Sequence, residues 1–345
     1  MRFICPKCKS PQLSLQQDCY VCAGCRKRYP IIAGIPDFRV YSFPYSDDES
    51  SDVRVLLASF AKLDYFELFK LRQSLFLDKS KTLEAQQEAR ALHEASLKNL
   101  ATYHFDHSDI FSRNVTRFRY IIGERIDHGL DSALELGCGR GTQLADMLSL
   151  YGHVTAIDNS LSELILTKKI LEHKSLADRV TLVAACSEAL PFQQDSFDVV
   201  NMRSVLEHVE DQEGSLHEVK GALRKGGLLL MEVPNRFTLG REPHVKIFGV
   251  GFVPRRWMRH YVHMLSRGQL TFGGTETPSY WELKRLLNAV FDTNWVHRVR
   301  LIEESRSGVT LLGKLYRRFA FVKCLFENAI TKSLCETHLV AAWKD

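Results

Sequence analysis

The sequence lacks any apolar run long enough to cross a lipid bilayer, and its first residues hold no hydrophobic segment of a secretory signal. Its composition, with 45% apolar and 25% charged residues over 345 positions, is typical of a globular protein. It also lacks internal repeats and low-complexity tracts. We therefore expect a cytoplasmic protein, in which the glycosylation sequon at Asn114 has no role.

Acidic residues are scarce in the first 40 positions, which hold only Asp18 and Asp37 against seven Lys and Arg. This segment therefore carries the whole net charge of +5, and the rest of the chain is balanced. A basic segment suits RNA, a phosphate group or an acidic partner, but it is equally compatible with a solvated surface.

Four of the nine cysteines form two C-x₂-C pairs within the first 25 residues. In a cytosolic chain such pairs indicate a metal rather than disulfides. Two pairs supply four thiolates to a tetrahedral zinc ion that is structural, because no coordination position is left open. Cys19 is an alternative, less symmetric ligand. The predicted zinc ligands are Cys5, Cys8, Cys22 and Cys25.

Composition divides the chain into three parts. Residues 1–40 are predicted to form a zinc ribbon, which we call the head. Residues 41–105 are predicted to contain a linker over 41–52, rich in Ser and acids, and then a helical segment. Residues 106–345 are predicted to form the main domain, with a helix near 111–127 and an insertion at about 236–277.

The main domain alternates short apolar runs with amphipathic stretches. This order predicts an α/β fold with a doubly wound, Rossmann-like parallel sheet. The S-x-x-E pattern at Ser279–Glu282 predicts the start of a late helix, and "THLVAAWK" predicts one closing strand.

The segment "LELGCGRGTQL" places three glycines between a predicted strand and a predicted helix. Glycines there allow a tight turn and a close approach of a ligand to the main chain. Asp158 ends the next strand, 21 residues after Gly137, where a carboxylate accepts hydrogen bonds from ribose hydroxyls. The loop reads G-x-G-x-G and follows Glu135, which favours a cationic nucleoside, S-adenosylmethionine (SAM), over a dinucleotide pyrophosphate. An ordinary tight turn is the remaining interpretation.

Five segments in order, "ELGCGRG", "AIDNS", "EALPFQQDSFDVV", "SVLEHVED" and "ALRKGGLLLMEVPN", resemble class I SAM-dependent methyltransferases. The similarity is to the branch with the ubiquinone-biosynthesis enzymes (methyltransferase type 11), over about 110–235. It implies a seven-stranded sheet and SAM binding. Cys186 stands where many relatives carry Asp, and its sulfur accepts hydrogen bonds weakly. The implied and inferred cofactor-binding residues are Glu135, Gly137, Cys138, Gly139, Gly141, Asp158, Asn159, Cys186, Ser187 and Arg203.

A hydroxyl acceptor benefits from a general base. Glu207 and His208 follow the fourth predicted strand, and His244 lies in the insertion, so these three are our catalytic candidates; His208 is also interpretable as a brace of its loop. Arg241, Arg255 and Arg256 are candidates for holding an anionic substrate group, and they are equally interpretable as ordinary surface arginines. The loop "NMRSVLEH" differs from the Pro-Pro-aromatic loop of enzymes that methylate nucleic-acid amino groups.

The head resembles the zinc ribbon of the tRNA-methyltransferase activator family, which implies a part that docks on a methyltransferase domain. The amphipathic stretch 308–334 predicts either peripheral membrane contact or an ordinary packed helix. We expect transfer of a methyl group to a hydroxyl of a small-molecule or glycan acceptor. RNA methylation, with the head binding RNA, and a non-catalytic SAM-binding scaffold are the alternatives.

Overall fold

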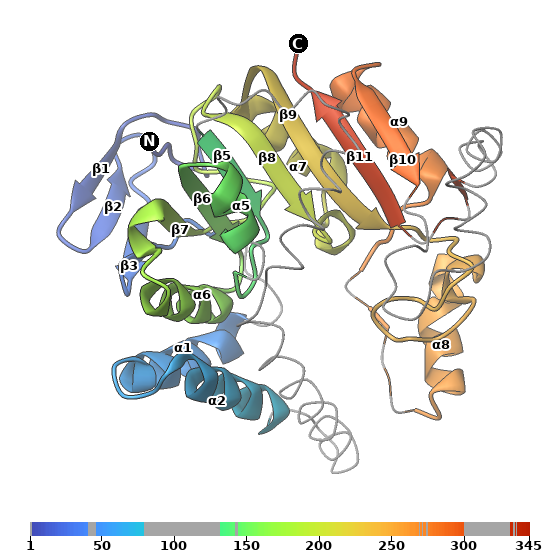
Figure 1. The fold of residues 1–345 in the computed structure, drawn as a ribbon, viewed down its shortest axis with the longest axis horizontal. Helices are drawn as coiled ribbons and strands as arrows, with labels where there is room; N and C mark the ends of the chain where they lie inside the picture. Colours follow the sequence, from blue (N-terminus) through green and yellow to red (C-terminus); the bar gives the residue numbers. More distant parts are fainter. Residues whose placement is uncertain are drawn as a thin grey trace.

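The computed structural model describes residues 2–40, 46–78, 132–141, 144–268, 270, 272–273, 275–299, 332–333, 335 and 337–345. These residues form a small four-stranded sheet and a seven-stranded sheet (Figure 1). The small sheet, with the order β1-β2-β3-β4, is the head. Its strands are β1 (Leu13–Gln16), β2 (Cys19–Cys22), β3 (Arg28–Ile32) and β4 (Ile35–Pro36).

The large sheet has the strand order β10-β11-β9-β8-β5-β6-β7. Strands β5 to β9 pair in parallel, and β11 pairs antiparallel with both β9 and β10. This order confirms the predicted Rossmann-like, seven-stranded fold, including the closing strand. The strands are β5 (Ser132–Leu136), β6 (His153–Asp158), β7 (Val180–Ala184), β8 (Phe197–Arg203), β9 (Leu223–Pro234), β10 (Trp295–Val299) and β11 (Thr337–Trp343).

Helices cover both faces of this sheet, and the two faces bury different residues of each strand. Successive side chains of a strand point to opposite sides. Accordingly, Val199 packs with the helices α5 (Leu144–Leu150) and α6 (Leu161–His173), whereas Val200 packs with α7 (Gln212–Ala222) and α9 (Tyr280–Phe291). Both valines are fully buried. Strands that are buried on both faces consist of continuous apolar residues, which is why the sequence predicted a buried sheet.

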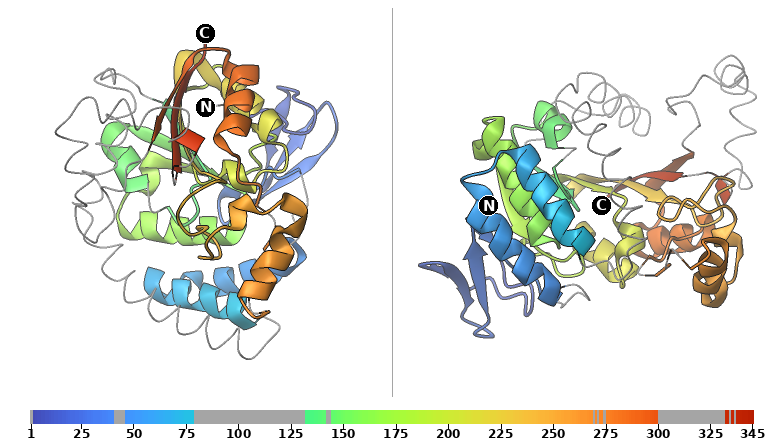
Figure 2. Two further views of the ribbon diagram at one scale, coloured as in Figure 1. Left: turned by 90° about the vertical axis from the view of Figure 1, so that its right-hand side faces the viewer. Right: turned by 90° about the horizontal axis from the view of Figure 1, so that it is seen from below.

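Two further helices, α1 (Ser46–Phe60) and α2 (Tyr65–Asp78), lie across α6 on the outside of the molecule (Figures 1 and 2). Leu56 and Leu68 are fully buried there. The prediction of a linker over 41–52 is wrong from Ser46 onward, because α1 begins at that residue. Serines and acids are favourable near a helix N-terminus, where they meet free N–H groups and the positive end of the dipole.

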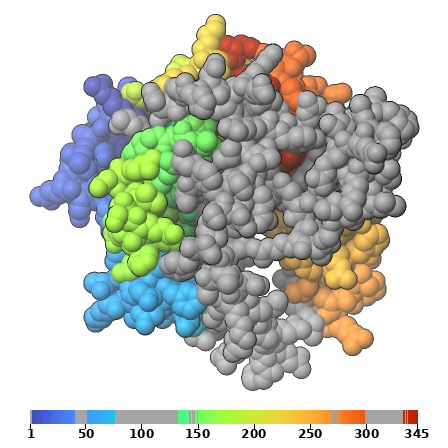
Figure 3. All heavy atoms as spheres, in the orientation of Figure 1, coloured from blue at the N-terminus to red at the C-terminus, as the bar shows by residue number. Residues whose placement is uncertain are grey.

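The head packs against the β7 edge of the large sheet rather than standing apart from it, and Figure 3 shows it at that side of the molecule. The backbone N–H of Phe38 donates to Ala184 O (2.8 Å), and that of Ile4 donates to Pro191 O (3.0 Å). Phe3 contacts both Phe38 and Phe192, with ring centroids 4.9 and 6.1 Å apart. The head therefore shares a hydrophobic core with the main domain.

The predicted helix near 111–127 lies outside the described residues, as does the stretch 308–334 apart from Lys332 and Ser333. Among the described residues, no helix combines the length and the apolar character that spanning a membrane requires. Residues 235–279 connect β9 to α9, and their described part contains η3 (Val250–Phe252) and α8 (Arg255–Leu265).

Candidate functional site

The glycine loop connects β5 to α5 and has a left-handed backbone at each glycine. The φ angles are +74° at Gly137, +49° at Gly139 and +72° at Gly141. At Gly137 there is also no room for a side chain, because a Cβ would lie 2.3 Å from Cγ2 of Val205. This loop therefore requires glycine both for its conformation and for its close contact with the segment after β8.

Asp158, the last residue of β6, holds the glycine loop and the start of α6 together. Its Oδ2 accepts a hydrogen bond from the Gly139 N–H (2.8 Å), and its Oδ1 accepts one from the Ser160 N–H (2.8 Å). Each carboxylate oxygen can accept more than one bond, so Asp158 remains chemically able to accept ribose hydroxyls.

A pocket of about 280 Å³ opens at the carboxyl ends of the parallel strands. In sheets of this kind, this edge is where ligands bind. Four strand ends, those of β5, β6, β7 and β8, contribute to it. Its lining consists of Leu136, Gly137, Asp158, Asn159, Cys186, Ser187, Glu188, Ser204, Val205, His208 and Val209.

Sequence reasoning missed Glu188, which lies in the pocket beside the expected pair Cys186 and Ser187. The Ser187 hydroxyl donates to Glu188 Oε2 (3.0 Å). Cys186 is buried and offers only a weak acceptor. Glu188 therefore places a carboxylate in the pocket two positions after Cys186. The sequence signal was the acid inside "CSEALPF".

Glu135 and Arg203, both predicted to bind the cofactor, are not among the residues that line this pocket. Glu135 is buried within the sheet, where the Asn201 side-chain amide donates to its Oε2. Arg203 pairs with Glu232 of the neighbouring strand β9 (3.2 Å). Cys138 is buried in the turn and bonds through its backbone N–H to Ile157 O (3.0 Å). In this structure, Glu135, Arg203 and Cys138 therefore bond to other residues of the protein and not to the space of the pocket.

Glu207 and His208 lie on η2 (Leu206–His208), which follows β8, and they differ in burial. Glu207 is fully buried, and within the described part of the chain neither of its carboxylate oxygens has a hydrogen-bond partner. Burial raises the pKa of Glu207 to about 7. His208 lines the pocket and is partly exposed, and burial lowers its pKa. His208 Nε2 lies 4.0 Å from Glu207 Oε1.

His244 comes from the insertion and is held by Glu242, a residue that sequence reasoning missed. The two carboxylate oxygens of Glu242 contact His244 Nδ1 (2.6 Å) and accept the backbone N–H groups of His244 and Val245 (both 2.8 Å). The hydrogen bond with Glu242 raises the pKa of His244, although burial opposes it. Despite burial, the same bonds keep the pKa of Glu242 below its usual value.

The structure brings the three catalytic candidates together. The His208 and His244 rings meet at right angles with centroids 5.1 Å apart. One ligand atom from each of Glu207, His208 and His244 lies within 4.8 Å of the others. The insertion therefore reaches His208, a residue of the pocket lining, through His244. Of the arginines predicted to hold an anion, Arg255 instead pairs with Glu282 of α9 (2.8 Å).

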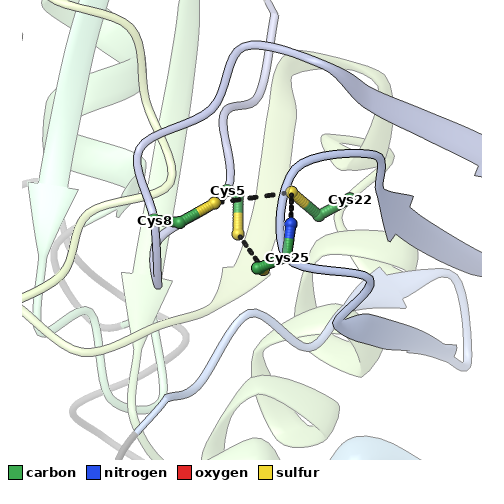
Figure 4. A group of neighbouring side chains, drawn as sticks. All are labelled: Cys5, Cys8, Cys22 and Cys25. Carbon is green, nitrogen blue, oxygen red and sulfur yellow. Dashed lines mark hydrogen bonds between the residues drawn. The ribbon is translucent and has the colours of Figure 1, made fainter.

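The four head cysteines point toward one another (Figure 4). The Sγ atoms of Cys5 and Cys25 are 3.6 Å apart, as are those of Cys8 and Cys22. Four thiolates around one zinc ion at Zn–S bonds of about 2.3 Å lie about 3.8 Å from one another. The cluster therefore fits a tetrahedral ion. Cys19 lies outside it, where its sulfur accepts a hydrogen bond from Arg28 (3.0 Å).

Comparison with known proteins agrees with this geometry. Residues 134–231 match the family described as methyltransferase domain, so the chain contains such a domain. The Ubiquinone/menaquinone biosynthesis C-methyltransferase UbiE of Shewanella frigidimarina is 30% identical over 156 residues, which cover 44% of this chain and 62% of the relative. The chain thus matches less than two thirds of that relative's length.

Solved structures of methyltransferases are also similar to this chain. One is phosphoethanolamine N-methyltransferase 2 of Haemonchus contortus with S-adenosyl-L-methionine, which is 17% identical with a TM-score of 0.43, covering 68% of this chain and 52% of that one. Another is the complex of the Haloferax volcanii Trm112 methyltransferase activator with a methyltransferase. It is 14% identical with a TM-score of 0.43, covering 71% of this chain and 91% of that one.

Proposed function

We propose that this protein transfers the methyl group of SAM to a hydroxyl of a small-molecule or glycan acceptor. The observation that carries the proposal is the pocket at the strand ends, where Gly137 presents bare backbone and Asp158 a carboxylate. We assign the ribose hydroxyls to Asp158 and the adenine amino group to Glu188. We assign the acceptor end to Glu207, His208 and His244, because His208 connects this cluster to the pocket.

In the proposed reaction, a lone pair of the acceptor oxygen forms a bond to the methyl carbon of SAM. The carbon–sulfur bond breaks, and its electron pair stays on sulfur to give S-adenosylhomocysteine. The hydroxyl proton passes to the solvent. The single positive charge of the sulfonium is thus carried away by this proton, and the methylated oxygen and the thioether sulfur are both neutral. The protein contributes mainly alignment of oxygen, carbon and sulfur, because the leaving group belongs to the cofactor.

The surface of the insertion favours an acceptor carried by an amphiphile, such as a lipid-linked sugar. Between residues 243 and 275 the chain holds five Lys and Arg and no Asp or Glu. Large apolar side chains are exposed on the same segment: Phe248 (59%), Trp257 (53%) and Met264 (57%). Cations mixed with exposed apolar groups suit the boundary between anionic headgroups and acyl chains.

We also assign a structural zinc ion to Cys5, Cys8, Cys22 and Cys25. The chemistry of four thiolates and their mutual distances support this assignment. An RNA role for the head has less support, because several of its cations are engaged within the chain. Lys9 pairs with Glu218, and Arg39 pairs with Asp37 (2.7 Å).

Calorimetry with SAM and S-adenosylhomocysteine tests the cofactor assignment. Both ligands are expected to bind, and Asp158→Ala is expected to weaken binding about 10- to 100-fold, as the loss of charged hydrogen bonds predicts. Asp178→Ala, which removes an exposed acid before β7, is the matched control and should bind normally. Absence of binding by the wild type, or unchanged binding by Asp158→Ala, would refute the proposal.

The acceptor class is tested with methyl-tritiated SAM and cell extract separated into water-soluble metabolites, lipids and RNA. Label in the lipid or metabolite fraction agrees with the proposal, and label stable to mild base and acid excludes a methyl ester. Label confined to RNA would replace the proposed acceptor with RNA. Binding of SAM without label in any fraction would favour a non-catalytic scaffold.

A further inference from the structure

The carboxylate of Glu207 is buried, and within the described residues no hydrogen-bond donor contacts it. The side chain is 0% exposed, and both of its oxygens lack a partner there. An ionised carboxylate in such a position costs several kcal/mol unless a cation or donors compensate for it. Its neighbourhood must therefore supply a proton or a positive charge.

Two imidazoles from different segments lie beside this carboxylate. His208 is its neighbour on η2, and His244 belongs to the insertion, 36 residues later. The donor atoms of the three side chains fall within 4.8 Å of one another, and both rings are partly exposed. Folding thus assembles two nitrogen donors and one carboxylate at one point on the edge of the pocket.

His244 is already oriented as a ligand would be. Its Nδ1 faces Glu242 Oε1 at 2.6 Å, which leaves Nε2 with its lone pair directed elsewhere. Histidines that ligate metals commonly donate their other ring N–H to a carboxylate in this way. Glu242 is itself fixed by two backbone N–H groups and is buried, so the ring has little freedom to turn.

We propose that Glu207, His208 and His244 bind a divalent first-row transition-metal ion at the acceptor end of the pocket. Two imidazoles and one carboxylate suit Mn²⁺, Fe²⁺, Co²⁺ or Zn²⁺. Bonds of about 2.1 Å place tetrahedral donor atoms about 3.4 Å apart, so donor atoms that lie up to 4.8 Å apart here must approach by up to about 1.4 Å, which the two exposed rings can supply. Three protein ligands leave positions open for an acceptor.

The ion's role follows from its place beside the cofactor pocket and, unlike its binding, rests on the proposed function. An acceptor oxygen bound in an open position would lie next to the pocket that His208 lines. A metal-bound hydroxyl loses its proton to water more readily than a free one, which makes the oxygen a better nucleophile. A metal-free base formed by His244 and Glu242, with Glu207 carrying a proton, is the competing interpretation, and it predicts no Mn²⁺ binding.

The test is a Mn²⁺ titration followed by electron paramagnetic resonance, on full-length, tag-free protein that already holds one zinc ion per chain. Mn²⁺ binds thiolates poorly, so the head cysteines do not compete. One Mn²⁺ site is expected. Glu207→Gln, which keeps the size of the buried side chain, should weaken it at least 10-fold, and His244→Gln should do the same. Glu213→Gln, an exposed acid at the start of α7, is the matched control.

Three outcomes overturn the inference: no binding of Mn²⁺, Co²⁺ or additional Zn²⁺ by the wild type, unchanged binding by Glu207→Gln, or full methyl transfer by protein shown to hold only its zinc. The melting temperature of each variant checks that it folds. SAM calorimetry on the same samples separates this failure from failure of the proposed function. Cofactor binding without Mn²⁺ binding refutes only the metal site, whereas the reverse refutes only the cofactor pocket.

Discussion

At the scale of single residues, the glycine at position 137 has no room for a side chain. Gly137→Ala would place a Cβ 2.3 Å from Val205 in a backbone with φ of +74°. The strain costs about 1–3 kcal/mol and moves the loop, so SAM affinity should fall at least 10-fold. Gly152→Ala is the control, because a Cβ there meets nothing within 4 Å. Equal calorimetric affinities for the two variants would contradict this expectation.

The residues that could be predicted are those whose position follows from the end of a strand. Asp158 and His208 line the pocket because each comes at or just after a strand's carboxyl end. Glu135 was predicted to bind the cofactor because it is close to the glycines in sequence, and its side chain lies beside Asn201 inside the sheet. Glu242 could not be found, since its role depends on how the insertion folds back toward His208.

At the scale of elements, the capping box of α9 makes a separable contribution to stability. Ser279 accepts the Glu282 N–H (3.3 Å), and the Glu282 carboxylate accepts the Ser279 N–H (2.8 Å). Ser279→Ala should lower the free energy of unfolding by about 1 kcal/mol, or the melting temperature by about 2 °C, measured by calorimetry. Ser279→Thr keeps the hydroxyl and should match the wild type. Identical melting curves for all three proteins would show that the cap contributes nothing.

The strands and the helices between them were predictable because hydrophobic periodicity reports burial directly. The strand "VTAID" and the helix "LSELILTKKILEH" appear in the structure as β6 and α6 with nearly those bounds. The segment after Ser46 was misread because Ser and Asp favour turns and helix starts alike. The sequence did not predict which elements pack together. The helices α1 and α2 cover α6 through contacts that no local sequence pattern indicates.

At the scale of the whole molecule, the head is connected to the cofactor pocket through Arg39. Its Nη1 donates to the backbone oxygen of Asn159, a pocket residue, at 3.0 Å, while Asp37 holds the guanidinium. Because thiolate clusters of this kind fold with their metal, removing zinc should disorder the head and withdraw this support. We expect chelation to weaken SAM binding several-fold and to lower the melting temperature.

The matched comparison is Arg39→Ala, which should retain one zinc ion per chain by elemental analysis and still bind SAM more weakly. Arg26→Ala, an exposed arginine of the same head, should behave as the wild type. If zinc removal leaves calorimetric SAM affinity unchanged, the head has no part in holding the pocket.

The shared packing of Phe3, Phe38 and Phe192 has a practical consequence for anyone who shortens the gene. A fragment that starts at β5, the strand before the glycine loop, would lack the head. It would expose the β7 edge of the sheet and the aromatic surface that the head covers to water. Such a fragment should be recovered from inclusion bodies rather than from the clarified lysate. The border between the parts, visible in the sequence, does not divide the molecule into pieces that can be expressed separately.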